Sequence, residues 1–216
     1  FSFDYSYTGT GIKVLEVPEG TPGSYPKTKL NPGDVVQTIN GQSVSLNEKL
    51  YESVLDNETG RELTMSVRAP GGAVRTVKYR ALSTGEYRGI TFENLLEARR
   101  QAVLAKSKDT IAYLHIAGMG GGELQRFNSQ LWADARGKKA IIIDVRNNGG
   151  GNTSDQIIDI LERAQNAIYV PRDGEPLTGP GQMWAKPIVV MCAETSFSNA
   201  EMFPAAMKTL GLATLV

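Results

Sequence analysis

The sequence has few of the residues that hold metals or form disulfides, and no apolar run long enough to span a membrane. In 216 residues there is one cysteine, Cys192, and one histidine, His115. One cysteine cannot form an internal disulfide, and no cluster of His, Cys, Asp and Glu has the spacing of metal ligands. No apolar run approaches the roughly 18 residues of a bilayer span. We therefore predict no metal, no cofactor and no membrane span.

An excess of charge of either sign is also absent. The chain has 23 basic and 23 acidic residues, which gives no reason to expect nucleic acid or an anionic membrane surface as the main partner. No signal peptide is visible, because residue 1 already has the pattern of a folded domain. The chain begins without Met and stops in the apolar run 212–216. We therefore expect both ends to be cuts through a larger protein.

Apolar residues, at 41% of the chain, are sufficient for a folded core. Residues 9–82 are rich in short β-branched runs separated by Gly and Pro, which indicates a β-rich module. The pair Asn40-Gly41 between two apolar runs predicts a hairpin turn. Ser45 can cap a helix with apolar positions four residues apart. The predicted elements are strands at 11–17, 35–39, 62–67 and 74–79, and a helix through Leu46, Leu50 and Val54.

The order of these elements, and above all LNPGDVVQTINGQSV at 30–44, resembles a PDZ domain. The resemblance implies a groove between the strand Gly11–Val14 and the helix Leu46–Val54, which would bind an extended peptide end by strand addition. The alternative is a β-barrel module that only packs on its neighbour. The implied peptide-binding residues are Gly11, Ile12, Lys13, Val14, Leu46 and Leu50.

From Thr110 the pattern changes to strands that alternate with helices. The stretch 140–145 is almost continuously apolar, as expected for a strand covered on both faces of its sheet. The alternation predicts an α/β layered domain with a largely parallel sheet. A helical connector at 84–108 leads into it. The predicted strands are 111–116, 140–145 and 187–191, and the predicted helices are 122–135, 154–167 and 199–210.

A glycine-rich stretch, DVRNNGGGN at 144–152, follows the second of these strands. Three glycines free the backbone to bend and to expose N–H groups. A phosphate-binding loop would need Lys followed by Ser or Thr, and the dinucleotide fingerprint G-x-G-x-x-G is also unmatched. These N–H groups therefore either face an oxyanion or form a tight turn. Asp144 and Arg146 are expected to form an ion pair that orients the loop.

The third strand leads into ETSFSNAEMF at 194–203, where a helix pattern begins. A serine at such a corner has an exposed Oγ and free N–H groups beside it, as acyl transfer requires. Ser198 is the first candidate nucleophile, and Ser196 is its rival. The alternative is that Ser198 only caps the helix with Glu201, in the S-x-x-E pattern.

The PDZ-like module, the glycine stretch and the serine corner, in this order, resemble the C-terminal processing and tricorn-like serine peptidases. YLHIAGMGGG at 113–122 and VRNNGGGNTSD at 145–155 most resemble the tricorn branch. The resemblance implies that Ser198 is the nucleophile. It also implies that the N–H groups of Asn199 and of a loop glycine form the oxyanion hole, with Gly149 and Gly150 as the candidates.

The same resemblance implies an α+β and α/β organisation in three parts. These are a PDZ-like β-rich domain at 1–83, the helical connector at 84–108, and a crotonase-like (ββα-type) serine peptidase core at 109–216. The core would be incomplete, and the whole would be truncated at both ends.

The catalytic base of that family is not found in this chain. The processing peptidases use a lysine downstream of the nucleophile, and Lys208 is too close to Ser198 for that spacing. The tricorn branch uses a histidine preceded by a serine, upstream of the PDZ-like module, and a glutamate well downstream of the nucleophile. His115 lies inside a predicted strand and is interpreted as structural. We therefore expect the isolated chain to have negligible peptidase activity.

The predicted function is a serine endopeptidase that acts through an acyl-enzyme on Ser198. The alternative is a non-catalytic PDZ-type scaffold that binds peptides on the same fold. An enoyl-hydratase-type enzyme is a third interpretation, which the PDZ-like module disfavours. The expected partners are peptides or unfolded proteins, and a homo-oligomer is compatible with the sequence. The compartment is not determined, although the resemblance slightly favours an exported or periplasmic protein over a cytoplasmic one.

Overall fold

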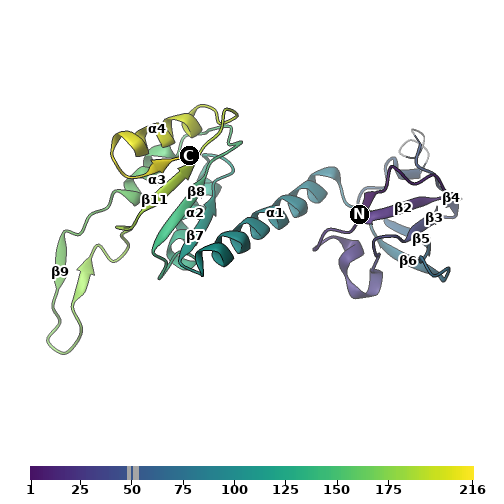
Figure 1. Ribbon diagram of the computed structural model, residues 1–216, viewed down its shortest axis with the longest axis horizontal. Helices are drawn as coiled ribbons and strands as arrows, with labels where there is room; N and C mark the ends of the chain where they lie inside the picture. The colour runs from purple at the N-terminus through teal and green to yellow at the C-terminus, as the bar shows by residue number, and fades with distance from the viewer. Residues whose placement is uncertain (48–49, 51–53) are drawn as a thin grey trace. The chain divides into compact units, whose positions relative to one another are not determined.

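The computed structural model describes residues 1–47, 50 and 54–216, and it divides into two compact units. Unit 1 is Phe1–Leu95 and unit 2 is Leu96–Val216. Each unit has a sheet and a hydrophobic core of its own (Figure 1). The helix α1, Thr84–Ser107, begins in unit 1 and ends in unit 2. The chain therefore passes between the units inside the stretch predicted as a helical connector.

Unit 1 is built on an antiparallel sheet with the strand order β1-β2-β3-β5-β6, and β4 pairs with β3. In β5, every second residue is buried, namely Leu63, Met65 and Val67. This period of two places one face of the strand on the core. The strands are β1 (Ser2–Phe3), β2 (Ile12–Glu16), β3 (Val35–Ile39), β4 (Gln42–Ser43), β5 (Glu62–Arg68) and β6 (Val74–Arg80).

The hairpin turn predicted at Asn40-Gly41 is confirmed and joins β3 to β4. Both residues have positive φ angles, 50° and 81°, as the preferred two-residue hairpin turn requires. Two short 3₁₀ helices, Pro22–Ser24 and Pro26–Thr28, occupy the Pro-rich turn between β2 and β3. The helix predicted from Ser45 to Val54 runs mostly through residues that lie outside the described part of the chain.

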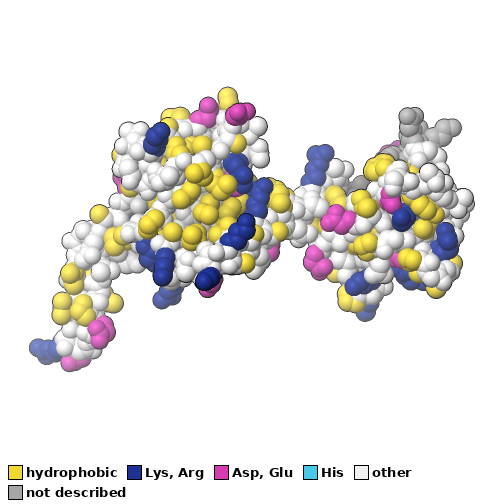
Figure 2. Space-filling model, in the orientation of Figure 1, with side chains coloured by type: hydrophobic (Ala, Val, Ile, Leu, Met, Phe, Trp, Pro, Cys, Tyr) yellow, Lys and Arg dark blue, Asp and Glu magenta, His cyan; other side chains and the backbone are white. Residues whose placement is uncertain are grey.

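Unit 2 contains the predicted parallel sheet, with the strand order β12-β11-β8-β7. One sheet face carries Leu114, Ile141 and Val190, which share a core with Phe127 of α2 and Phe203 of α4. The elements are β7 (Ile111–His115), α2 (Gly121–Ala133), β8 (Ala140–Asp144), α3 (Ser154–Leu161), β11 (Ile188–Met191), α4 (Asn199–Thr209) and β12 (Thr214–Leu215). On the face turned to the viewer, hydrophobic side chains gather over this unit, with Lys and Arg at the margin (Figure 2).

The helix predicted at 154–167 is shorter than expected, because α3 ends at Leu161. A two-stranded hairpin follows it, formed by β9 (Ala167–Tyr169) and β10 (Leu177–Gly179). Four large apolar side chains in or beside this hairpin are exposed, namely Ile168, Tyr169, Val170 and Leu177. Over the described residues, no helix has the length and apolar character to cross a membrane.

Candidate active site

Ser198 occupies the corner between β11 and α4 in an uncommon backbone conformation. Its φ is 58° and its ψ is −124°, a region that costs a residue other than glycine about 1–3 kcal/mol. The residue is exposed and directly precedes the first residue of α4. A sharp strand-to-helix turn that exposes a serine Oγ is the arrangement in which α/β hydrolases present a nucleophile.

Glu201 caps the Ser198 corner, in the S-x-x-E pattern that was the alternative interpretation of this residue. Glu201 Oε2 accepts a hydrogen bond from the Ser198 N–H at 2.7 Å. The Ser198 side chain makes no cap hydrogen bond, and the Glu201 N–H donates to Ser198 O at 2.8 Å. Helix capping therefore does not occupy the Ser198 hydroxyl.

The glycine bend after β8 packs directly against the Ser198 corner. A Cβ atom added to Gly150 would lie 2.6 Å from Phe197 O and 2.8 Å from Ser198 Cβ. Gly150 also has a φ of +90°, so both the backbone conformation and the close approach require glycine here. The two stretches identified from the sequence are therefore in contact.

The hydrogen bonds of the bend show which of its N–H groups already have an acceptor. The Gly150 N–H donates to Asn148 Oδ1 at 2.8 Å, so it is not free for an oxyanion. The C=O and N–H of one trans peptide point in opposite directions. In the peptide that joins Asn148 to Gly149, the Asn148 oxygen accepts from Phe197 N–H at 3.0 Å. The Gly149 N–H of this peptide therefore points away from Phe197.

The third glycine of the bend, Gly151, was not among the predicted donors. Gly150 O accepts from Met119 N–H at 2.9 Å, so the Gly151 N–H of that peptide points away from Met119. In the described part of the chain this N–H donates to no protein group. The Asn199 N–H is the first of α4 and has no acceptor within the helix. Its nitrogen lies 3.1 Å from the Cβ position of Gly150. The N–H groups of Gly151 and Asn199 therefore have no acceptor among the described residues, and both are available as hydrogen-bond donors.

Ser196, the rival nucleophile, is buried, and its hydroxyl is hydrogen-bonded to the backbone. Its Oγ donates to Val145 O at 3.0 Å and accepts from Ala193 N–H at 3.3 Å. A second link between the same two loops joins Thr195 Oγ1 to Asn147 Oδ1 at 2.7 Å. These bonds tie the serine corner to the end of β8, and they give Ser196 a structural position.

Asp144 is fully buried at the end of β8 and accepts several hydrogen bonds. The predicted ion pair is confirmed, because Arg146 Nε lies 2.9 Å from Oδ1 and Arg146 Nη2 lies 2.7 Å from Oδ2. Tyr113 OH donates to Oδ2 at 2.6 Å. Burial alone would raise the pKa of Asp144, but the hydrogen bonds from Arg146 and Tyr113 outweigh it and hold the pKa below 3.8.

His115 and Lys208 do not complete the site. His115 is buried in β7, with Nδ1 4.0 Å from Asp144 Oδ2, and β8 lies between its strand and β11. Burial lowers the pKa of His115 from 6.5. Lys208 is ten residues beyond Ser198 along α4, which corresponds to about 15 Å of helix. Across the described ranges, no group of three or more His, Cys, Asp or Glu could hold a metal ion.

The predicted peptide-binding strand of unit 1 has a partner strand on each side. β2 pairs with β3 at Ile12 and Lys13 and with β1 at Val14 and Glu16, so β1 occupies part of the edge at which a peptide would be added. Ile12 and Val14 are buried in the core, as is Leu50, whereas Leu46 is half-buried. Lys13 forms an ion pair with Asp4 of the preceding segment, at 3.0 Å. The strands at the two ends of this sheet order are β1 and β6.

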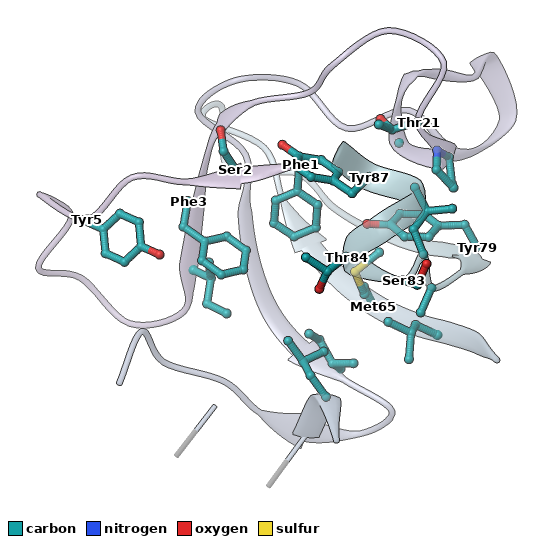
Figure 3. Close-up of a pocket in the computed structure, with 18 residues that line it drawn as sticks. Phe1, Ser2, Phe3, Tyr5, Thr21, Met65, Tyr79, Ser83, Thr84 and Tyr87 are labelled. Carbon is teal, nitrogen blue, oxygen red and sulfur yellow. The ribbon is translucent and has the colours of Figure 1, made fainter. Parts of the chain in front are cut away.

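An apolar pocket of about 420 Å³ lies beside β1. Of the predicted peptide-binding residues, the pocket wall includes only Ile12. Figure 3 shows side chains of the first residues on one side of the pocket and side chains of β5, β6 and the start of α1 on the other. The labelled residues that line it are Phe1, Ser2, Phe3, Tyr5, Thr21, Met65, Tyr79, Ser83, Thr84 and Tyr87.

Comparison with known proteins shows similarity to peptidases over unit 2 and beyond it. Residues 110–216 match the profile of peptidase family S41. The tricorn protease of Thermoplasma acidophilum is 29% identical over 184 residues, which covers 85% of this chain and 17% of that protein. A tricorn protease homolog of Saccharolobus solfataricus is 25% identical over 225 residues, covering 99% of this chain and 20% of that protein.

Among solved structures, the crystal structure of the tricorn protease matches with a TM-score of 0.75 and 27% sequence identity. The match covers 99% of this chain and 21% of that chain. The chain thus spans about a fifth of the length of these relatives. The sequence similarity extends over most of the 216 residues and includes the glycine bend and the serine corner. Residues 110–216 thus belong to peptidase family S41, and the chain as a whole is similar to the tricorn proteases.

Proposed function

We propose that this chain carries the nucleophile and the oxyanion hole of a serine endopeptidase. The observation that carries the proposal is the contact between Gly150 and the Ser198 corner. It brings a strained, exposed serine next to a backbone bend and to the first N–H of a helix. Backbone donors fixed in this way stabilise developing negative charge without reorganisation during the reaction.

In the proposed reaction, Ser198 Oγ attacks a peptide carbonyl carbon and its proton passes to a general base. The carbonyl oxygen becomes an oxyanion, which the N–H groups of Gly151 and Asn199 stabilise. The C–N bond then breaks, the amine leaves with the proton from the base, and an acyl-enzyme remains. Water, deprotonated by the same base, hydrolyses the ester and releases Ser198. Losing one oxyanion donor costs about 2.7–4 kcal/mol of barrier in a well-studied protease.

We place the base outside this chain. Neither His115 nor Lys208 is positioned to take the proton of Ser198, for the reasons given above. The proposal therefore assigns to the 216 residues the attacking group and the oxyanion donors. It assigns to other parts of a longer protein the group that moves the proton.

A fluorophosphonate probe tests the proposal, because it modifies only an activated serine. In the full-length protein, labelling should be lost in Ser198→Ala and kept in Ser196→Ala, and the 216-residue chain alone should label very slowly. A full-length protein whose labelling does not depend on Ser198 would contradict the proposal. Rapid peptide cleavage by the isolated chain would contradict the placement of the base.

We also propose that unit 1 is PDZ-like and that it binds an extended peptide at β1 rather than at β2. Two observations favour this second function: β1 is one of the edge strands of its sheet, and an apolar pocket lies beside it. A peptide added to β1 would place alternate side chains toward the pocket. Nuclear magnetic resonance (NMR) titration of the 216-residue chain with peptides that end in Leu or in Asp tests this. Shifts at Phe3 and Tyr87 that occur only with Leu are expected, and shifts confined to β2 would contradict it.

We also propose a crotonase-like core for unit 2, peptides or unfolded proteins as substrates, a homo-oligomer, and an exported or periplasmic location. The parallel strands of unit 2, with a glycine bend and a serine corner at their carboxyl ends, support a crotonase-like core. Peptides or unfolded proteins are the proposed substrates. Sedimentation analysis of the full-length protein would test the proposed homo-oligomer, and cell fractionation would test the exported or periplasmic location.

A further inference from the structure

Asn148 forms hydrogen bonds to three segments that surround the proposed site. Its side chain is completely buried, and its Nδ2 donates to Ile116 O, just after β7, at 2.9 Å. Its Oδ1 accepts from Gly150 N–H at 2.8 Å. Its main-chain oxygen accepts from Phe197 N–H at 3.0 Å. One residue thus joins the end of β7, the glycine bend and the residue before Ser198.

We propose that Asn148 is a positioning residue that fixes the glycine bend relative to the Ser198 corner, and so fixes the direction of the oxyanion donor. The inference rests on the function proposed above. By holding the Gly150 N–H, the amide oxygen sets the plane of the Gly149–Gly150 peptide. The orientation of the next peptide, which carries the Gly151 N–H, depends on that plane.

Only an amide provides both bonds at this position. The planar group offers an acceptor on one side and donors on the other, and Asn148 uses them in opposite directions. A carboxylate would accept from Gly150 but repel Ile116 O, and its buried charge would be costly. An alanine would leave Gly150 N–H and Ile116 O unpaired in the interior, with the bend free to rotate. The surrounding structure therefore requires this residue type.

The expected effect is on the chemical step rather than on substrate binding. Displacement of a reacting group by about 1 Å can lower the rate by about 100-fold. In full-length protein, kcat of Asn148→Ala should fall by about that factor, while KM stays unchanged. Affinity for a peptide boronate, which forms a tetrahedral adduct with the serine, should fall by the same factor. Affinity for the product peptide should not change, although a general loss of structure would reduce all of these quantities.

Thr195→Val is the matched control. It removes the exposed Thr195–Asn147 hydrogen bond between the same two loops and leaves Asn148 untouched. It should bind the boronate as the wild type does. A folded Asn148→Ala protein with wild-type boronate affinity would overturn the inference. An equal loss in Thr195→Val would also overturn it, because any loosening of these loops would then suffice.

Amide hydrogen exchange provides a second measurement on the 216-residue chain that needs no activity. The Gly150 amide should be protected, the Gly151 amide should exchange quickly, and Asn148→Ala should remove the protection at Gly150. If the alanine variant does not fold, the exchange measurement is made on Asn148→Asp instead. Its introduced carboxylate, repelled by Ile116 O, should move out of this position and leave Gly150 N–H unprotected. Once protonated, the carboxyl can both accept from Gly150 and donate to Ile116 O, so protection at Gly150 should return as the pH is lowered.

The two proposals fail separately. Absence of Ser198-dependent labelling in the full-length wild type overturns the proposed function. The exchange data then still decide whether Asn148 sets the bend. Rapid exchange of the Gly150 amide in the wild type overturns the role of Asn148 even where labelling succeeds.

Discussion

Gly150 and Ser198 are in contact across the candidate site, with the Cβ position of the glycine 2.8 Å from Ser198 Cβ. Gly150→Ala should therefore push the bend away from the serine corner. Because the residue also has a φ of +90°, we expect a loss of about 1–3 kcal/mol in unfolding free energy and loss of fluorophosphonate labelling in the full-length protein. Urea unfolding and labelling rates measure the two effects.

Gly149→Ala is the control for this prediction. Nothing lies within 4 Å of its Cβ position, and the substitution keeps the backbone N–H. It should fold and label like the wild type. If the two alanine variants behave alike, the close approach at Gly150 is not what the site requires.

Glu201 holds the backbone of Ser198 through the 2.7 Å bond to its N–H. Glu201→Ala should cost about 1 kcal/mol as the loss of a capping residue, and it should slow labelling because Ser198 can relax from its strained φ. Glu201→Gln retains an acceptor and should restore most of the labelling rate. A glutamine variant as slow as the alanine variant would show that the charge of Glu201, rather than its hydrogen bond, matters.

Ser196 and Ser198 should respond in opposite ways to substitution by alanine. Ser196→Ala removes a buried hydroxyl bonded to Val145 O and Ala193 N–H, so stability should fall by about 1 kcal/mol while labelling persists. Ser198→Ala should abolish labelling with little loss of stability, because the side chain is exposed. Thermal unfolding and probe labelling of both variants decide the matter. The prediction fails if labelling is lost in Ser196→Ala.

His115 should make stability depend on pH near neutrality. Burial lowers its pKa from 6.5, and the Arg99 and Arg126 charges oppose protonation further, whereas Asp144 and Glu123 favour it. With the folded pKa below the unfolded one, the unfolded state binds the proton first as the pH falls. The unfolding free energy should therefore decrease from about pH 7 downward, until the folded pKa is passed.

His115→Gln removes that proton-binding group and should flatten the decrease, as urea unfolding between pH 7 and pH 5 would show. An equally steep decrease in the variant would assign it to other groups. The carboxyl of Asp144 contributes separately. Its pKa is lowered from 3.8, so its stabilising contribution is present above that pH and is lost only below it.

The sequence patterns predicted the parallel sheet of unit 2 well, because β7, β8 and β11 are buried apolar runs whose identity depends little on their neighbours. They failed where pairing decides the structure. β1 has only two residues, Ser2 and Phe3, and it is a strand because β2 offers it a partner. A pattern that shows β2 to be a strand does not show which strands will pair with its two edges.

For the candidate site, too, the sequence indicated the local features but not the contacts between segments. The serine corner and the glycine bend are local features, and both were found at the expected residues. Which glycine N–H of the bend is left without an acceptor is not a local feature, because it depends on the side chain of Asn148 and on Met119 from another segment. The only sequence signal for Asn148 was its place before the three glycines, and a buried amide there looks the same as a turn asparagine.

The β9–β10 hairpin has a practical consequence for handling this protein. Its sheet has only two strands in the described structure, so its outer backbone edges are unpaired, and four large apolar side chains beside them face water. Unprotected strand edges of this kind promote aggregation. At the concentrations used for spectroscopy the chain should self-associate through this hairpin, and Leu177→Lys is the substitution that should keep samples monodisperse.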